Sequence, residues 1–126
     1  MIILAPISDK NEINRLFSEN GLEFTKFSGC VKAKCGEEVL GFCLYDMDKN
    51  GIVIKKIFPE NDLMLSDGIL RSTLHVAAER SIMNAFFSGE DTEKLCDKLG
   101  FIKDKAEKRL NINKLFESCC SCRNND

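Results

Sequence analysis

The sequence predicts a mixed α/β fold, of the α+β type, built on one mostly antiparallel sheet with helices on both of its faces. Residues 29–58 contain consecutive strand patterns joined by tight turns, which predicts antiparallel neighbours. A helical pattern at residues 65–81 then separates the fourth strand from the fifth. Because a strand–helix–strand unit forms a right-handed crossover, we expect these two strands to be parallel and central in the sheet.

The first strand and helix are expected in residues 1–6 and 8–21. Ser8 or Asp9 can accept hydrogen bonds from the first amides of the helix, as N-cap residues do. One face of this helix is apolar at i, i+3 and i+4 spacing, through Ile13, Leu16 and Phe17.

Residues 29–58 divide into three strands with two turns. The middle strand is apolar on both faces, which is typical of a central strand. Asn50 and Gly51 mark the second turn, since both tolerate positive φ. The alternation breaks at Lys55 and Lys56, where two like residues adjoin. This break indicates either a β-bulge or two lysines near a strand edge.

Two further helices are expected at residues 65–81 and 91–100, with a fifth strand between them at 82–89. A closing strand pair follows at 101–113. The expected N-caps are Ser66 or Asp67 for the first of these helices and Asp91 or Thr92 for the second.

Length and composition predict one compact domain over residues 1–118, followed by a cysteine-rich tail at 119–126. The formal net charge of −2 gives no positive surface for nucleic acid or an anionic membrane, so neither is expected as a partner. No apolar run is long enough to span a membrane, and the first residues lack the basic start of a signal peptide. We therefore expect a cytoplasmic protein whose seven cysteines are mostly reduced.

Two segments carry a resemblance to a known superfamily. Residues 57–61, IFPEN, are similar to a V-x-P-E-x motif at the end of the fourth strand of the GNAT N-acetyltransferases. Residues 96–101, CDKLGF, are similar to the Y-x-K-x-G-F motif at the end of the last helix in that superfamily. The element order agrees as well. The sequence therefore resembles a GNAT protein over roughly residues 30–112.

The resemblance implies a site for acetyl-CoA. Its pantetheine arm would pair with strand backbone where the fourth and fifth strands part. Backbone amides at Ile57 and Phe58 would polarise the thioester carbonyl. The acyl acceptor would be a small-molecule or peptide amine, and a homodimer is an expected assembly. The pyrophosphate would lie on amides of a loop and the following helix start, at Leu65, Ser66, Asp67, Gly68 and Ile69.

The loop departs from the Q/R-x-x-G-x-G/A pattern of the superfamily. Counted forward from the proline of the motif, the basic position falls on Asp62 and the glycine positions fall on Leu65 and Asp67. Each nearby carboxylate costs about 1 kcal/mol against a phosphate charge even in water. We therefore predict weak or absent binding of acetyl-CoA. A shifted register has no basic residue either, because it uses Asn61, Met64 and Ser66.

Candidate catalytic residues are sparse. Cys96 stands where many members of the superfamily use a tyrosine to protonate the leaving thiolate, which makes it the candidate acid. A cysteine on the core side of a helix is more often a small hydrophobe. The fourth strand carries lysines where a glutamate often serves as the base, and His75 lies in mid-helix.

The end of the chain is crowded with Cys119, Cys120 and Cys122. Zinc sites usually use two spaced cysteine pairs, which this cluster does not offer, so no metal is expected. Thiol exchange is the alternative to a frayed, reduced tail. Three functions stay open: an acetyl-CoA-dependent N-acyltransferase, a non-catalytic interaction module that uses the apolar ridge at 63–65 or the tail, and a thiol redox or metal-binding protein.

Overall fold

The structure is a computed structural model that describes residues 1–116. Within this part of the chain, no helix combines the length and apolarity needed to cross a membrane. The elements follow in the order β1 (Ile2–Pro6), α1 (Lys10–Glu19), β2 (Ser28–Cys35), β3 (Glu38–Asp48), β4 (Gly51–Phe58), α2 (Leu63–Glu79), β5 (Ala85–Phe87), α3 (Glu90–Leu99), β6 (Ile102–Asp104) and β7 (Arg109–Leu110).

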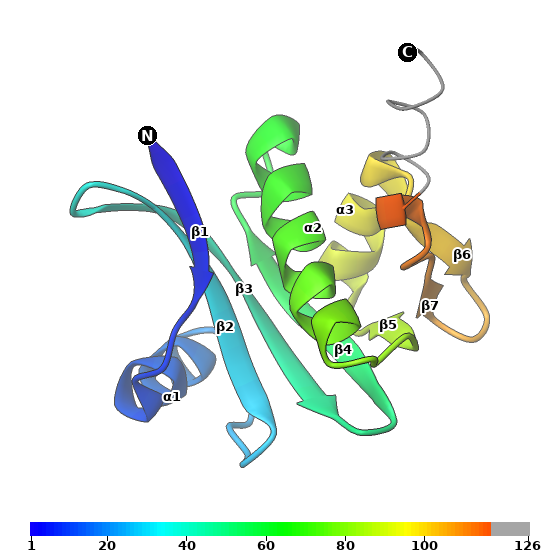
Figure 1. Cartoon of the computed structure of the whole chain (residues 1–126), viewed down its shortest axis with the longest axis horizontal. Coiled ribbons are helices and arrows are strands. Elements are labelled where there is room, and N and C mark those ends of the chain that lie inside the picture. The colour runs from blue at the N-terminus through cyan, green and yellow to red at the C-terminus, as the bar shows by residue number, and fades with distance from the viewer. Residues whose placement is uncertain (117–126) are drawn as a thin grey trace.

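These strands form one sheet in the order β1-β2-β3-β4-β5-β7-β6 (Figure 1). The neighbours from β1 to β4 are antiparallel, as are β5–β7 and β6–β7. The pair β4–β5 is parallel, with α2 as the crossover between its strands. The structure thus confirms the predicted fold class, including the central parallel pair.

Helices cover both faces of the sheet. The long helix α2 packs its buried stripe, which includes Leu70 and Leu74, on the face that carries Val31 and Ile54. On the opposite face, α1 packs Phe17 and Ile13 against Cys30 and Leu44. Because α1 supplies this second apolar layer, strand β2 is buried on both faces at Cys30 and Val31.

The helix caps show where local signals decide the fold. Asp9 caps α1, since its carboxylate accepts from the amides of Asn11 and Glu12 at 2.9 and 3.4 Å. Of the two residues predicted to cap this helix, Ser8 and Asp9, the structure confirms Asp9. The predicted cap of α3 is wrong, because that helix begins after Gly89, which makes no side-chain cap. Thr92 lies inside α3, and its hydroxyl bonds to β4 instead.

Candidate functional site

The candidate site lies where β4 parts from β5. In the β3–β4 ladder, Lys56 pairs with Leu44 and Ile54 pairs with Tyr45, so Lys55 has no residue opposite it. Of the two explanations that the sequence left open, the structure shows the β-bulge. The pattern broke at two like residues because a bulge places two neighbouring side chains on the same face of the sheet.

The bulge turns two successive carbonyls toward β5 and α3. The carbonyl of Ile54 accepts from the amide of Ser88 at 2.9 Å, and that of Lys55 accepts from the hydroxyl of Thr92 at 3.0 Å. On a regular strand, successive carbonyls point to opposite edges. The parallel ladder ends at the pair of Ile54 and Phe87, so β4 runs on without β5.

The first turn of α3 fills the space that this divergence leaves. Thr92 and Leu95 are 4% and 3% exposed. A separate cavity of about 90 Å³ lies beside α3, near Glu60. Its lining consists of Glu60, Asp91, Lys94, Leu95 and Lys98.

Beyond the bulge, β4 stays paired with β3. Ile57 lies opposite Cys43 and is buried, while Phe58 lies opposite Phe42 and stacks on its ring with centroids 5.5 Å apart. Gly41 permits this packing, because a Cβ at that position would lie 2.3 Å from the carbonyl oxygen of Phe58. The two residues predicted to polarise a thioester therefore lie at the end of β4, in an ordered ladder.

Helix α2 begins earlier than the sequence predicted. Its N-cap is Asp62, and neither Ser66 nor Asp67 has that role. The Asp62 carboxylate accepts from the amide of Leu65 at 3.1 Å. Ser66 is buried, and its hydroxyl donates back to the carbonyl of Asp62 at 2.9 Å. The prediction was wrong because the apolar residues that follow Asp62 already form the first turn of the helix.

The residues predicted to hold the pyrophosphate therefore lie in the first two turns of α2. The carboxylate of Asp67 is bonded to Arg71 at 2.8 Å, and Ile69 is fully buried. Gly68 faces Leu4 of β1. Amides inside a helix donate to carbonyls four residues back, so they are not available to a ligand. Only the first amides of a helix lack such acceptors, and one of these, at Leu65, donates to Asp62.

Cys96, the candidate acid, lies on α3 in the same core cluster as Ile57 and Phe101. It is fully buried, and burial raises the pKa of its thiol to about 12. A thiol in this environment keeps its proton at neutral pH. These properties are those of a small hydrophobic core residue.

Other candidate groups are accounted for by ordinary contacts. His75 is exposed and lies 3.2 Å from Glu79. The side chains of Lys55 and Lys56 pair with Asp46 at 3.9 Å and Glu60 at 3.4 Å. Within residues 1–116, no group of three or more His, Cys, Asp or Glu residues could hold a metal ion. The predictions for Cys119, Cys120 and Cys122 lie outside the described residues.

Sequence reasoning missed the structural roles of three residues in this region. Asp62 carried a recognisable signal, because an aspartate before an apolar run is a common helix start. Thr92 and Gly41 carried none, since their roles depend on contacts with distant β4 residues.

Comparison with solved structures places the fold. No protein-family model matches the chain, and no curated protein matches it either. A ribosomal-protein-alanine N-acetyltransferase from Brucella melitensis biovar Abortus 2308 aligns with a TM-score of 0.60 at 13% identity, covering 82% of this chain and 94% of that chain. A protein assigned to the GNAT acetyltransferases, from Desulfovibrio desulfuricans, aligns with a TM-score of 0.57 at 12% identity, covering 82% of this chain and 87% of that chain.

These likenesses define the class of the protein: the chain has the GNAT fold. The fold is compatible with acyl transfer, because acetyltransferases are built on it. At 12–13% identity the likeness carries the fold alone, and the reaction has to be argued from the residues of the site.

Proposed function

We propose that this chain is a non-catalytic GNAT-fold protein that binds a protein partner through the start of α2 and does not use acetyl-CoA. One observation carries the proposal: the Asp62 carboxylate occupies the helix N-terminus on which the pyrophosphate of a GNAT coenzyme would lie. A side chain of this protein thus takes the place of the anion.

The electrostatics of this arrangement oppose a pyrophosphate. Two like charges 4 Å apart repel by about 1 kcal/mol in water and about 4 kcal/mol at an effective dielectric constant of 20. The helix dipole favours an anion by about 0.3–1 kcal/mol. The repulsion from Asp62 therefore matches or exceeds the attraction from the helix, and the described loop from Pro59 to Asp62 contains no basic residue.

The strand gap supports the same conclusion. The carbonyl of Lys55 faces the gap and already accepts from Thr92 at 3.0 Å. A pantetheine arm that paired with this part of β4 would have to replace that bond. The first turn of α3 would have to move for such an arm to enter.

The surface at this end of the molecule suits a protein partner. Phe58, Leu63 and Met64 are 48%, 44% and 88% exposed, at the end of β4 and the start of α2. Methionine and aromatic side chains are adaptable and energetically important in protein interfaces. Leu63 and Met64 are neighbours in the first turn of α2, and adjoining exposed apolar side chains are a common mark of such interfaces.

An N-acyltransferase that uses acetyl-CoA and an amine acceptor is the second candidate. The bulge at Lys55 and the parallel strands that part after Ile54 favour it, because the resemblance to GNAT enzymes implies this geometry at the coenzyme site. In this second function Cys96 would be the acid. Its burial and its pKa of about 12 oppose that role.

Calorimetry with acetyl-CoA separates the two candidates. We expect no saturable heat from the full chain. The variant Asp62→Ser keeps a capping oxygen and removes the charge, so any gain in affinity would measure the repulsion by the carboxylate. Saturable, micromolar binding by the unmodified chain would overturn the proposal and favour the acyltransferase.

Partner binding is tested with a matched pair of variants. Met64→Lys places a charge on the proposed surface, while Met83→Lys places the same charge on another exposed methionine. Partners captured by the wild-type chain from a lysate should be lost with Met64→Lys and retained with Met83→Lys. Equal loss or equal retention with both variants would contradict the assignment of the surface.

A further inference from the structure

The outer edge of β1 is open to another strand. β1 is the terminal strand of the sheet, so within residues 1–116 no strand lies on its other side (Figure 1). Residues 1–7 carry no charged side chain, and Ile2 and Ile3 are 51% and 61% exposed. Natural proteins usually protect such edges with charges, bulges or a covering element. An apolar, uncharged edge therefore needs a partner.

The hydrogen-bond pattern shows which groups this edge offers. The amide of Ile7 donates to the carbonyl of Cys30 at 2.8 Å, so Ile7 bonds toward β2. Along an antiparallel strand, the backbone N–H and C=O groups of successive residues point alternately to one edge of the strand and to the other. Ile2, Leu4 and Pro6 therefore direct their backbone groups outward. Pro6 has no N–H, which sets the end of the ladder that β1 can form.

We propose that β1 pairs antiparallel with β1 of a second copy of this chain, about a two-fold axis at Leu4. About a two-fold axis, the same strand of each copy forms the interface, so each copy contributes an identical surface. In this register Leu4 lies opposite Leu4 of the second copy, and the bulky Ile3 lies opposite the small Ala5. The two sheets then continue into one, with α1 of both copies on the same side.

Hollows beside β1 match this pairing in shape. Ile3 and Ala5 pair with Lys34 and Lys32, so they lie on the α1 face. On that face Ile3 of the second copy would be placed over a hollow of about 480 Å³. Its lining includes Ala5 and Ile7, and also the charged Asp9, Glu12, Lys32 and Lys34. On the α2 face, a second hollow of about 410 Å³ is lined by Leu4, Pro6, Ser72, His75, Val76 and Glu79, among others.

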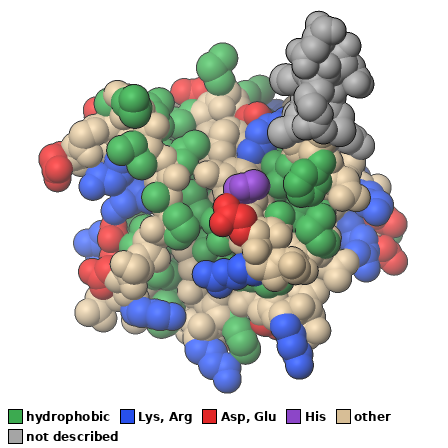
Figure 2. Space-filling view, in the orientation of Figure 1, with side chains coloured by type: hydrophobic (Ala, Val, Ile, Leu, Met, Phe, Trp, Pro, Cys, Tyr) green, Lys and Arg blue, Asp and Glu red, His purple; other side chains and the backbone are tan. Residues whose placement is uncertain are grey.

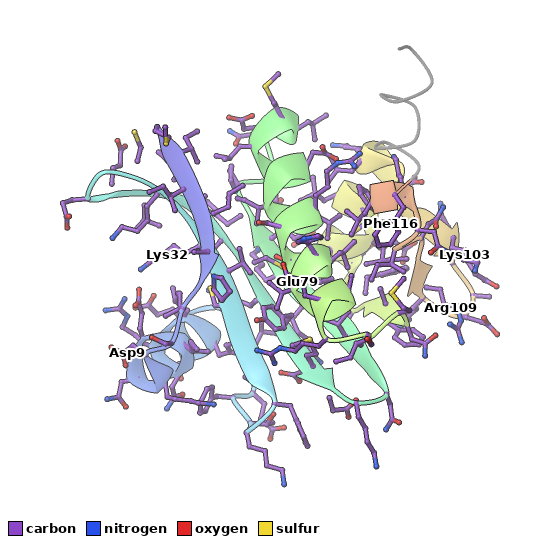
Figure 3. The ribbon with its side chains drawn as sticks, viewed as in Figure 1. Asp9, Lys32, Glu79, Lys103, Arg109 and Phe116 are labelled. Carbon is purple, nitrogen blue, oxygen red and sulfur yellow. The ribbon has the colours of Figure 1, made fainter. Side chains whose placement is uncertain are left out.

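The surface charges also fit a two-fold pairing. On this face of the molecule, apolar side chains lie on both sides of the histidine (Figure 2). Lys34 lies beside Ile3 near the start of β1. Asp9 follows the far end of the strand (Figure 3). Antiparallel pairing brings Asp9 of one copy to the same end of the interface as Lys34 of the other. Lys32 is already paired with Glu12.

Sedimentation equilibrium of the full chain under reducing conditions tests the pairing. We expect the wild-type protein to have twice the chain mass of 14.2 kDa at about 0.1 mM. Ile3→Lys should weaken the dimer by about tenfold or more, because it adds a charge to the edge. Met83→Lys adds the same charge to an exposed apolar residue that precedes β5, a strand separated from β1 by three others, and should leave the dimer unchanged.

The register is tested by crosslinking. Residues opposite each other in a non-hydrogen-bonded pair are close enough for a disulfide. A mixture of Ile3→Cys and Ala5→Cys chains should therefore crosslink, and neither chain should do so alone. The background for both replaces four cysteines by serine: Cys35, Cys119, Cys120 and Cys122.

Several results would overturn the proposal. A wild-type chain that stays monomeric at about 0.1 mM has no such interface. A dimer that Ile3→Lys does not weaken uses another surface, provided that circular dichroism shows the variant to be folded. Crosslinking by Ile3→Cys alone would contradict the two-fold axis at Leu4.

Discussion

Substituting Gly41 by alanine tests the packing that positions the end of β4. A Cβ at this position would lie 2.3 Å from the carbonyl oxygen of Phe58, 2.8 Å from Cδ1 of Ile69 and 2.9 Å from Cδ of Pro59. The nearest of these atoms belongs to the backbone, so it cannot turn away as a side chain can. Overpacking of this kind typically costs about 1–3 kcal/mol, and we expect Gly41→Ala to lie at the upper end, at about 3 kcal/mol.

Gly68→Ala is the matched control. Gly68 lies inside α2, and a Cβ there would lie 3.8 Å from Cδ1 of Leu4, an ordinary contact. Replacing a glycine by alanine within a helix stabilises it by about 0.5–1 kcal/mol. This expectation depends on the early start of α2. If residue 68 belonged to a glycine loop of the kind that wraps a phosphate, the same change would destabilise the protein.

Urea unfolding followed by circular dichroism measures both variants. The free energies of unfolding of the two variants should differ by about 4 kcal/mol, with the wild-type value between them. The reasoning is refuted if Gly41→Ala unfolds within about 0.5 kcal/mol of the wild type, the size of an ordinary surface substitution. Destabilisation by Gly68→Ala would refute the observed helix start.

Three further predictions follow from the structure. Thr92→Val should lower the free energy of unfolding by about 1–3 kcal/mol, because it leaves the Lys55 carbonyl without its hydrogen-bond donor. In the same urea measurement, Thr92→Ser should retain most of the wild-type free energy of unfolding, because it keeps the hydroxyl. Burial raises the pKa of the Cys96 thiol from its ordinary 9.0 to about 12, so the unfolded chain loses this proton at a lower pH than the folded chain. The free energy of unfolding should therefore fall as pH rises from 9 to 12. Urea titrations across this range should show a shallower fall for Cys96→Ala than for the wild type. Elemental analysis of the full chain should find no stoichiometric zinc, and one zinc per chain would contradict our interpretation of the C-terminal cysteines.

The fold was predictable because its signals are local and repeated. The turn at Asn50 and Gly51, and the broken alternation at Lys55 and Lys56, are visible in the sequence, and the structure confirms a hairpin and a bulge there. The parallel pairing of β4 and β5 followed from chain order and the handedness of crossovers.

The candidate site was only partly predictable, because its decisive contacts join distant residues. The loop chemistry around Asp62 was visible. The observed caps, however, lie four or five residues before the expected ones in α2 and two or three residues before them in α3. Ser66 looks like a cap in the sequence, yet its side chain faces the core and donates to a carbonyl of the preceding turn. Nothing local to Thr92 indicated that it would bond to Lys55, 37 residues earlier in the chain.

The central claim is that the start of α2 and the end of β4 do not hold acetyl-CoA. A titration of isotope-labelled protein with acetyl-CoA, followed through its backbone amide signals, tests this residue by residue. We predict no saturable shift at Ile57, Phe58 or the amides from Leu63 to Ile69. Saturable shifts concentrated on these amides would contradict the account, because they would place the coenzyme at the start of α2 and the end of β4.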